Sequence, residues 1–95
     1  MTVLLAALFA TSQPALAATA PKPEMFDTVC SACHTVGGGV KVGPDLAGVA
    51  GRKSPADLDR WLKDPQAYKP GTIMPKLDMT DAQRAAFVKW LSTLK

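Results

Sequence analysis

The sequence predicts an all-α fold, with three to five helices in residues 18–95. Two helix starts carry favourable capping residues, at 54–57 and at 80–83. After the second start, apolar residues recur at the i, i+3, i+4 spacing of one buried helix face. No segment shows the alternation of apolar and polar residues that marks a half-buried strand. These observations together indicate a small helical domain.

Residues 1–17 have the pattern of a secretory signal peptide. Val3–Ala10 is a short apolar run, and an A-x-A site predicts cleavage after Ala17. The run is shorter than the roughly 20 residues that span a bilayer, so no membrane span is expected after processing. No Lys or Arg precedes it, which departs from the pattern, and a retained N-terminal tail is the alternative. Cleavage would leave residues 18–95 as one exported, periplasmic domain.

One helix and one irregular segment are expected first in this domain. Residues 24–33 should form the helix, with four side chains on or near one side: Met25, Phe26, Val29 and Cys33. Residues 35–51 are rich in glycine, with three consecutive glycines at 37–39 and a Gly-Pro pair at 43–44. Gly and Pro favour turns, so this second segment is expected to be a loop.

The second helix is expected from Ser54 to about Lys63. Ser54 suits the N-cap, Pro55 the first helical position, and Asp57 the third. The Asp-Pro pair at 64–65 should end this helix, because the residue before a proline avoids helical backbone angles. One further turn over residues 65–68 is compatible with the sequence.

The last helix is expected from Thr80 to about Leu94. An extended loop over 69–78 precedes it, because two prolines and a glycine interrupt regular structure there. Thr80 and Gln83 have the spacing of a capping box. The expected buried face consists of five apolar residues: Ala86, Phe87, Trp90, Leu91 and Leu94.

Composition narrows the classes of function. The chain has 11 Lys and Arg against 8 Asp and Glu, a net charge of +3, and no long basic run. This balance does not indicate nucleic-acid binding, but it permits a basic docking surface for an acidic partner. A domain of about 80 residues is also near the size at which a polypeptide core alone is marginally stable.

The pentapeptide Cys30-Ser31-Ala32-Cys33-His34 carries the most specific chemistry. C-x-x-C-H is the attachment pattern of a c-type haem. Two thiols on one face of a helical turn can both add to the vinyl groups at one porphyrin edge. His34, on that same face, can place an imidazole nitrogen under the iron. The sequence therefore predicts one covalent haem c, attached through Cys30 and Cys33, whose burial would supply the missing apolar bulk.

Two other interpretations of this motif are weaker. A thioredoxin-like redox pair would require a surrounding βαβ pattern, which the sequence does not have. A zinc site would require more ligands than these three clustered residues. Covalent haem attachment in bacteria also takes place outside the cytoplasm, in agreement with an exported protein.

A second axial ligand for the iron is expected from methionine, the common partner of histidine in electron-transfer cytochromes. Met25 lies on the attachment helix and cannot reach across the haem plane. Met74 lies in the Pro- and Gly-rich loop, where the chain can pass over the far face of the ring. Met79 directly precedes the N-cap of the last helix, where core packing is the usual role. Met74 is therefore favoured, with Met79 or an open site as the alternatives.

These features together resemble the class I c-type cytochromes, the small soluble bacterial kind. The resemblance covers about residues 23–95. It rests on four motifs that occur in the order of the family: CSACH at 30–34, GPDLAG at 43–48, KPGTIMP at 69–75 and FVKWL at 87–91. It implies a small cytochrome c fold around one haem, thioether bonds at Cys30 and Cys33, His34 as proximal ligand and Met74 as distal ligand.

The resemblance also implies roles around the cofactor. The carbonyl of Pro44 should accept a hydrogen bond from the proximal histidine and fix its orientation. Arg52 and Trp61 match positions that bond haem propionates in some relatives. A solvated basic side chain and an ordinary core indole are the alternatives for these two residues.

Four further residues match the family pattern. Tyr68 and Thr72 resemble the loop that leads to the distal methionine. Phe26 and Trp90 match the aromatic pair at the crossing of the first and last helices. Residues 37–39 are more glycine-rich than the family pattern requires, and the sequence offers no physical reason for this.

The function implied is that of a one-electron carrier between redox proteins, not of an enzyme. A dedicated cytochrome subunit of a periplasmic oxidoreductase is the second hypothesis, and a ligand-binding or sensing haem protein is the third. A free carrier could be monomeric. Lys41, Lys69 and Lys76 lie in loops expected around the haem crevice, where they could attract an acidic partner.

Overall fold

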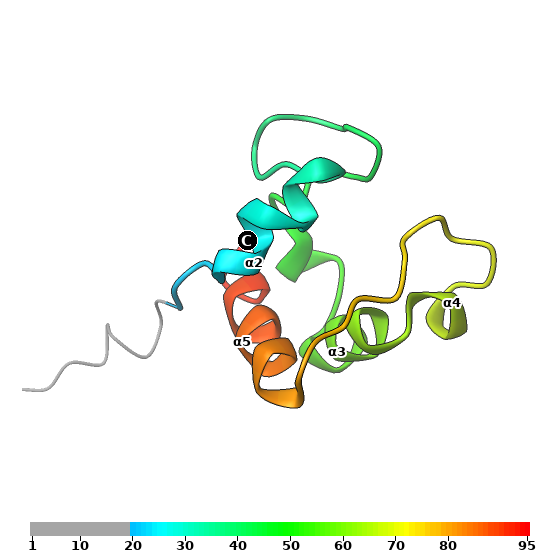
Figure 1. Cartoon of the computed structure of the whole chain (residues 1–95). Coiled ribbons are helices and arrows are strands. Elements are labelled where there is room, and N and C mark those ends of the chain that lie inside the picture. The colour runs from blue at the N-terminus through cyan, green and yellow to red at the C-terminus, as the bar shows by residue number, and fades with distance from the viewer. Residues whose placement is uncertain (1–19) are drawn as a thin grey trace, which may run out of the picture.

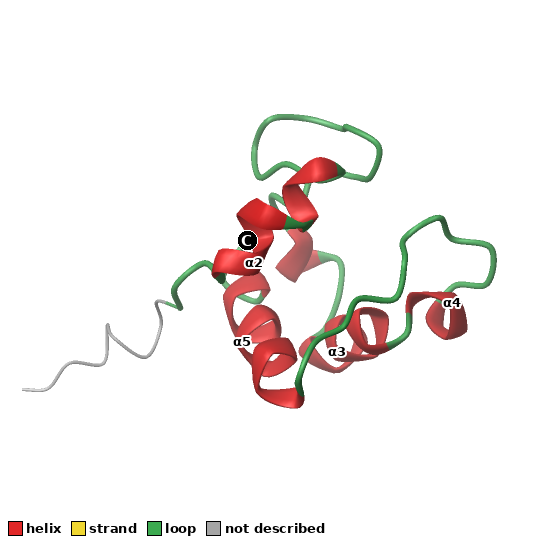
Figure 2. Cartoon of the chain, viewed as in Figure 1, coloured by secondary structure: helices red, strands yellow, loops and turns green. Residues whose placement is uncertain are grey.

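A computed structural model describes residues 20–95, so the expected signal peptide and its cleavage site lie outside the described residues. These residues form four α-helices and two short 3-10 helices, and this part of the chain has no strand (Figures 1 and 2). In chain order the elements are α2 (Glu24–Thr28), η1 (Cys30–Ala32), η2 (Val49–Gly51), α3 (Pro55–Lys63), α4 (Pro65–Tyr68) and α5 (Asp81–Leu91). The predicted all-α class is confirmed.

The single helix expected over 24–33 is divided, and that prediction was wrong in this respect. α2 ends at Thr28, and Val29 leaves helical geometry with φ −126° and ψ −57° before η1 begins. Two adjacent β-branched residues at this point disfavour helix continuation. The Ser31 hydroxyl also donates to the Asp27 carbonyl at 2.7 Å. Such side-chain bonds compete with the regular helical ladder.

The predicted helix starts are present with their capping bonds. The Ser54 hydroxyl accepts from the Asp57 amide at 3.1 Å at the start of α3. At the start of α5, the Thr80 hydroxyl accepts from the Gln83 amide at 3.1 Å, and the Gln83 carbonyl oxygen accepts from the Thr80 amide at 2.8 Å. The turn over 65–68 is also helical, as α4, and begins at an Asp64 cap.

The end of α5 differs from the prediction. The helix stops at Leu91, three residues before the expected end, and Leu94 is half-buried beyond it. Ala86 is exposed rather than part of the buried face. Phe87 is the first residue of that face, and Ala86 precedes it by about 100° around the helix axis, outside the buried stripe.

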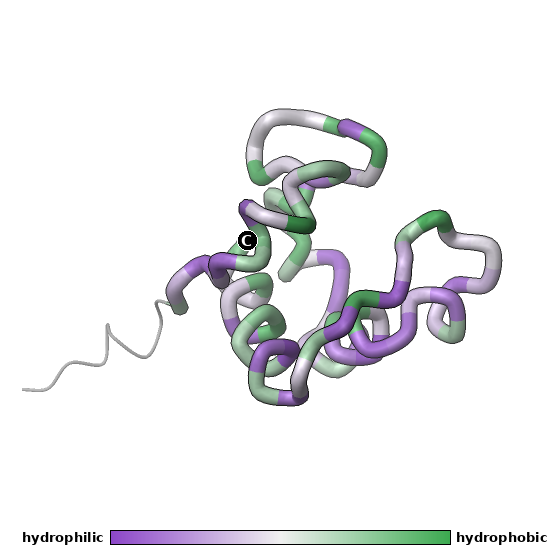
Figure 3. The backbone as a smooth tube through the Cα atoms, viewed as in Figure 1, coloured by the Kyte–Doolittle hydropathy of each residue, from purple (hydrophilic) through white to green (hydrophobic). Residues whose placement is uncertain are grey.

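The core contains seven buried hydrophobic side chains: Phe26, Val49, Leu58, Leu62, Phe87, Trp90 and Leu91. α3 packs against α5, and the chain ends beside α2 (Figure 1). Figure 3 shows that hydrophobic and hydrophilic residues are interspersed along α3 and α5, as expected for helices with one buried face. Within residues 20–95, no helix is both long enough and apolar enough to span a bilayer.

Phe26 and Trp90 join the first and last helices. Their ring centroids are 5.1 Å apart, with an angle of 67° between the rings, which is an edge-to-face contact. The contact implied by the resemblance is therefore present. This contact joins α2 to the C-terminal helix α5. The attachment segment, residues 30–34, follows α2 closely and is therefore held near α5.

We predict that Phe26→Ala destabilises the haem-loaded protein by about 3–5 kcal/mol, the usual cost of deleting a buried aromatic ring. Denaturant unfolding followed by circular dichroism measures this change. Val40→Ala, at a side chain that is 80% exposed, serves as the control and should change stability by less than about 0.5 kcal/mol. Equal stability of Phe26→Ala and the control would contradict the role assigned to this contact.

Candidate cofactor site

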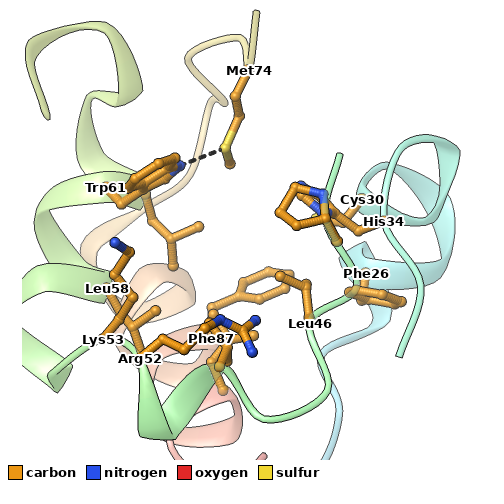
Figure 4. Close-up of a pocket in the computed structure, with 14 residues that line it drawn as sticks. Phe26, Cys30, His34, Leu46, Arg52, Lys53, Leu58, Trp61, Met74 and Phe87 are labelled. Carbon is orange, nitrogen blue, oxygen red and sulfur yellow. Dashed lines mark hydrogen bonds between the residues drawn. The ribbon is translucent and has the colours of Figure 1, made fainter. Parts of the chain in front are cut away.

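A cavity of about 290 Å³ lies within the helical core. Six of the seven buried core hydrophobics line it, all except Trp90. The other lining residues include His34, Met74 and two cations, Arg52 and Lys53 (Figure 4). Ligand sites in proteins are typically apolar cavities of this kind with a few polar groups.

His34 is held at the wall of the cavity by one hydrogen bond. Its Nδ1 lies 2.8 Å from the carbonyl oxygen of Pro44. A carbonyl can only accept, so Nδ1 carries the proton and donates. In this tautomer of the neutral ring, Nε2 keeps its lone pair and can bind a metal. The Pro44 contact implied by the resemblance is thus present.

Gly43 provides the space for the imidazole ring. A Cβ at this position would lie 2.5 Å from Cε1 and 2.8 Å from Nδ1 of His34. Real Cβ atoms do not approach so closely, so any larger residue would displace the ring. The Gly43 amide also donates to the Cys33 carbonyl at 2.7 Å. The sequence marked Gly43 as a turn residue and as the start of the GPDLAG motif, but gave no sign of its contact with the imidazole.

Both cysteines are free and half-buried, and η1 places them beside His34. The His34 and Cys33 amides donate to the same Cys30 carbonyl, at 2.9 and 3.1 Å. Cys30 lines the cavity. Burial, and then the nearby Cys33, raise the pKa of the Cys30 thiol, which is therefore protonated at neutral pH.

Met74 lies across the cavity from His34. Figure 4 shows Met74 and Trp61 on one side, and Cys30 and His34 on the other. The Trp61 indole Nε1–H donates to the Met74 sulfur at 2.9 Å. Met25 and Met79 are also half-buried against the core, but neither lines the cavity. Of the three candidate methionines, Met74 is thus the one that the fold brings to this site.

The loop that carries Met74 is fixed by short-range bonds. The Thr72 hydroxyl accepts from the Met74 amide at 3.3 Å, and the Gln66 side chain donates to the Thr72 carbonyl. Tyr68 does not line the cavity. Its ring packs against that of Trp61, with 4.7 Å between centroids. Thr72 and Tyr68 therefore support Met74 and Trp61 rather than contact the cavity.

Arg52 and Lys53 bring positive charge to the cavity wall. The Arg52 guanidinium donates to the carbonyls of Ala47 and Asp45, both at 3.1 Å. The Lys53 ammonium lies 5.2 Å from the centroid of Trp61, a cation–π distance. Within residues 20–95, Arg52 uses two of its five N–H groups in these bonds, so others remain available to an anion. Trp61 directs its N–H to Met74 in this structure, not toward an anionic group.

The site therefore fits a covalent haem on the chemistry of its side chains. Its walls are apolar, an imidazole and a thioether face each other across it, and a thiol lies next to the imidazole. Cationic side chains are available for the two propionates. When bound, haem supplies one-electron iron redox chemistry at this position.

Comparisons with known proteins agree with this geometry. Residues 23–95 match the family model described as cytochrome c. The chain is 36% identical to cytochrome c2 of Rhodopila globiformis, over 76% of this chain and 89% of that protein. It is 34% identical to the cytochrome c-type cyt cy of Rhodobacter capsulatus, over 75% of this chain and 46% of the relative.

Two further similarities extend the comparison. The chain is 34% identical to cytochrome c oxidase subunit 2 of Alkalihalophilus pseudofirmus, over 70% of this chain but 22% of that subunit. The match thus spans less than half the length of two of these relatives. The solved cytochrome c domain of the pp3183 protein from Pseudomonas putida superposes with a TM-score of 0.57 at 32% identity, covering 72% of this chain and 81% of that one. The chain belongs to the cytochrome c family, and its cofactor is covalent haem c.

Proposed function

We propose that the protein is a periplasmic one-electron carrier with His34 and Met74 as the axial ligands of a haem bound through Cys30 and Cys33. The observation that carries this proposal is that His34 and Met74 line one cavity from facing sides, with Cys30 beside His34. Membership of the cytochrome c family supports electron transfer as the activity. Cleavage after Ala17 would indicate that the protein is exported. N-terminal sequencing of the mature protein tests whether this cleavage occurs.

Hydrogen bonds affect the donor strengths of the two proposed axial side chains in opposite directions. The bond to Pro44 fixes the orientation of the His34 ring and makes its Nε2 a better donor. Trp61 acts on Met74 in the opposite sense, because its N–H takes up electron density at the sulfur. A thioether sulfur has two lone pairs, so one can bind iron while the other accepts from the indole. Weak donation from sulfur favours the reduced iron and a high potential.

Nothing else near the cavity is arranged for catalysis in residues 20–95. With both axial positions filled by protein, a change of oxidation state requires no bond to be made or broken. The mostly apolar lining would surround a bound haem with apolar side chains and limit its contact with water. The protein contributes ligation, burial and a surface for brief docking.

A dedicated subunit of a redox enzyme is the second candidate, and one feature favours it. Val36, Val40 and Val42, in the loop after the attachment segment, are 43%, 80% and 61% exposed. Lys41, between two of them, turns its ammonium back to the Ser31 carbonyl at 2.8 Å. This loop therefore presents methyl groups rather than charge, as at a lasting protein–protein interface.

We predict that Met74→Ala abolishes the weak near-infrared charge-transfer band of ferric His/Met haem and lowers the potential. The reason is that the alanine variant loses the thioether that favours ferrous iron. Spectroscopy and redox titration of the purified haem protein measure both effects. Met79→Ala is the matched control and should retain both properties. Survival of the band in Met74→Ala, together with its loss in Met79→Ala, would move the ligand to Met79.

We predict that electron transfer with an acidic redox protein slows as salt is added, because exposed charges are screened beyond about 8 Å at physiological ionic strength. Lys69 and Lys76 are exposed in the loop between α4 and α5 that carries Met74, here called the methionine loop. Lys76 also borders a hollow whose lining includes Arg60 and Lys63. Stopped-flow kinetics with reduced flavodoxin, an acidic one-electron donor, measures the second-order rate. Charge reversal at Lys69 or Lys76 should lower it several-fold.

Charge reversal at Lys95, at the end of the chain, is the control for this experiment and should have a smaller effect. None of these changes should alter the potential, since the side chains do not contact the cavity. A rate that is independent of salt and insensitive to all three reversals would refute electrostatic docking. That result would favour the apolar loop as the interface, and the subunit hypothesis with it.

A further inference from the structure

The family resemblance leaves the three consecutive glycines at 37–39 unexplained, and two of them, Gly37 and Gly39, are bound by one side chain. The Asp45 Oδ1 accepts from the Gly37 amide at 2.7 Å and from the Ala47 amide at 2.9 Å, and Oδ2 accepts from the Gly39 amide at 2.9 Å. Gly37 and Gly39 have φ of +88° and +94°, a conformation that favours glycine. The glycines thus allow the backbone to direct two amides at one carboxylate.

Residues 45–47 of the same loop make further hydrogen bonds through their backbone. The Arg52 guanidinium donates to the carbonyls of Asp45 and Ala47, both at 3.1 Å. The Leu46 amide donates to the Thr35 carbonyl at 2.8 Å. Asp45 is therefore fixed through its side chain and through its own carbonyl, in a segment that has no regular secondary structure.

This hydrogen-bond network includes the residue that follows the carbonyl bound by His34. The carbonyl that accepts from His34 Nδ1 belongs to the peptide unit between Pro44 and Asp45. A peptide unit is planar, so the orientation of this carbonyl is set by the residues on its two sides. Pro44 has a fixed φ. Asp45, whose carboxylate and carbonyl are both bound, provides the other constraint.

We propose that Asp45 is a positioning residue for the proximal histidine, acting through the Pro44–Asp45 peptide unit. Asp45 touches neither the imidazole nor the cavity. Its carboxylate anchors the loop at three amides, and the loop holds the Pro44 carbonyl against His34 Nδ1. The inference rests on the proposed function, because it assigns His34 as the iron ligand.

The carboxylate suits this role better than an amide would. Three N–H groups converge on its two oxygens, and an ionised carboxylate only accepts. These amides, that of Ala47 first, lower the pKa of Asp45, so it stays charged at neutral pH. An asparagine in the same place would present its NH₂ group to one of the amides and lose that bond.

The test is Asp45→Asn in the haem-loaded protein, and the readout is exchange of the His34 Nδ1 proton with solvent, followed by nitrogen NMR of the ferrous form. We expect this proton to exchange at least tenfold faster in Asp45→Asn than in the unmodified protein. The potential should rise, because a weaker bond to Pro44 makes the imidazole a poorer donor to ferric iron. The near-infrared band should persist, since both ligands remain.

Asp78→Asn is the matched control, because it removes the same charge from another exposed loop. This control should leave the exchange rate of the His34 Nδ1 proton unchanged. It should also not produce the rise in potential that is expected for Asp45→Asn. Gly43→Ala is the positive comparison, since its methyl group would displace the imidazole directly. Unchanged exchange in Asp45→Asn, with a clear increase in Gly43→Ala, would overturn the proposal.

A second variant keeps the test decisive if Asp45→Asn fails to take up haem. Gly37→Ala retains the carboxylate but strains one of its amide donors, because Gly37 has a φ of +88°. No atom lies within 4 Å of a Cβ at this position, so the strain comes from the backbone angle and not from a clash. We expect a smaller acceleration in the same direction. Gly71→Ala, with a φ of +86° and equal space in the methionine loop, should have no effect on this proton. Equal exchange rates in the two glycine variants would refute the coupling.

The outcomes also separate this inference from the proposed function. Absence of the near-infrared band in the unmodified ferric protein would refute His/Met ligation itself. Presence of the band, with an exchange rate that no Asp45 or Gly37 change affects, would refute only the role of Asp45.

Discussion

The hydrophobic core of this protein is built around a cavity. Six of the seven buried hydrophobic side chains line that cavity, whose volume is about 290 Å³. At about 24 cal/mol per Å³, a cavity of this size left without apolar contents would cost about 7 kcal/mol. That is comparable with the entire stability of a small domain, about 5–15 kcal/mol. We therefore propose that haem is a structural component, because filling this cavity would complete the packing between α2, α3 and α5.

The two side chains that we propose as ligands reach the cavity from loops, and each makes one side-chain hydrogen bond there. His34 follows η1 and donates to Pro44, whereas Met74 lies in the loop before α5 and accepts from Trp61. Neither loop has regular secondary structure, so side-chain bonds replace the helical ladder as the source of order. Asp45 does this for the first loop, and Gln66 and Thr72 for the second. Under the proposed ligation the two bonds would have opposite effects, since one would strengthen a donor to iron and the other would weaken one.

The features that could be predicted from the sequence are those encoded over short distances. The caps at Ser54 and Thr80 and the attachment motif each depend on residues within four positions, and the structure contains both caps and the clustered motif side chains. The order of the motifs also led to the correct family. The break after Thr28 was missed because it reflects a weak local competition, in which β-branched residues and a serine hydroxyl oppose continuation of the helix.

Contacts between distant segments could not be read from the sequence. The closeness of Gly43 to the imidazole, the three amides bound by Asp45 and the indole bond to Met74 all require the folded chain. Trp61 illustrates the limit: the resemblance implied a role toward a haem propionate, and nothing in the sequence indicated its bond to a sulfur 13 residues away. Arg52 likewise uses part of its donor capacity on two backbone carbonyls.

The central claim, that the haem completes the core, is tested most directly by thermal unfolding of the Cys30→Ala/Cys33→Ala double variant prepared without haem. Circular dichroism of this form, beside the haem-loaded protein, measures helix content and the cooperativity of unfolding. If haem is needed to complete the core, this form should show little native-like signal and no cooperative transition. A cooperative transition from a helical state that matches the haem-loaded protein would contradict the claim.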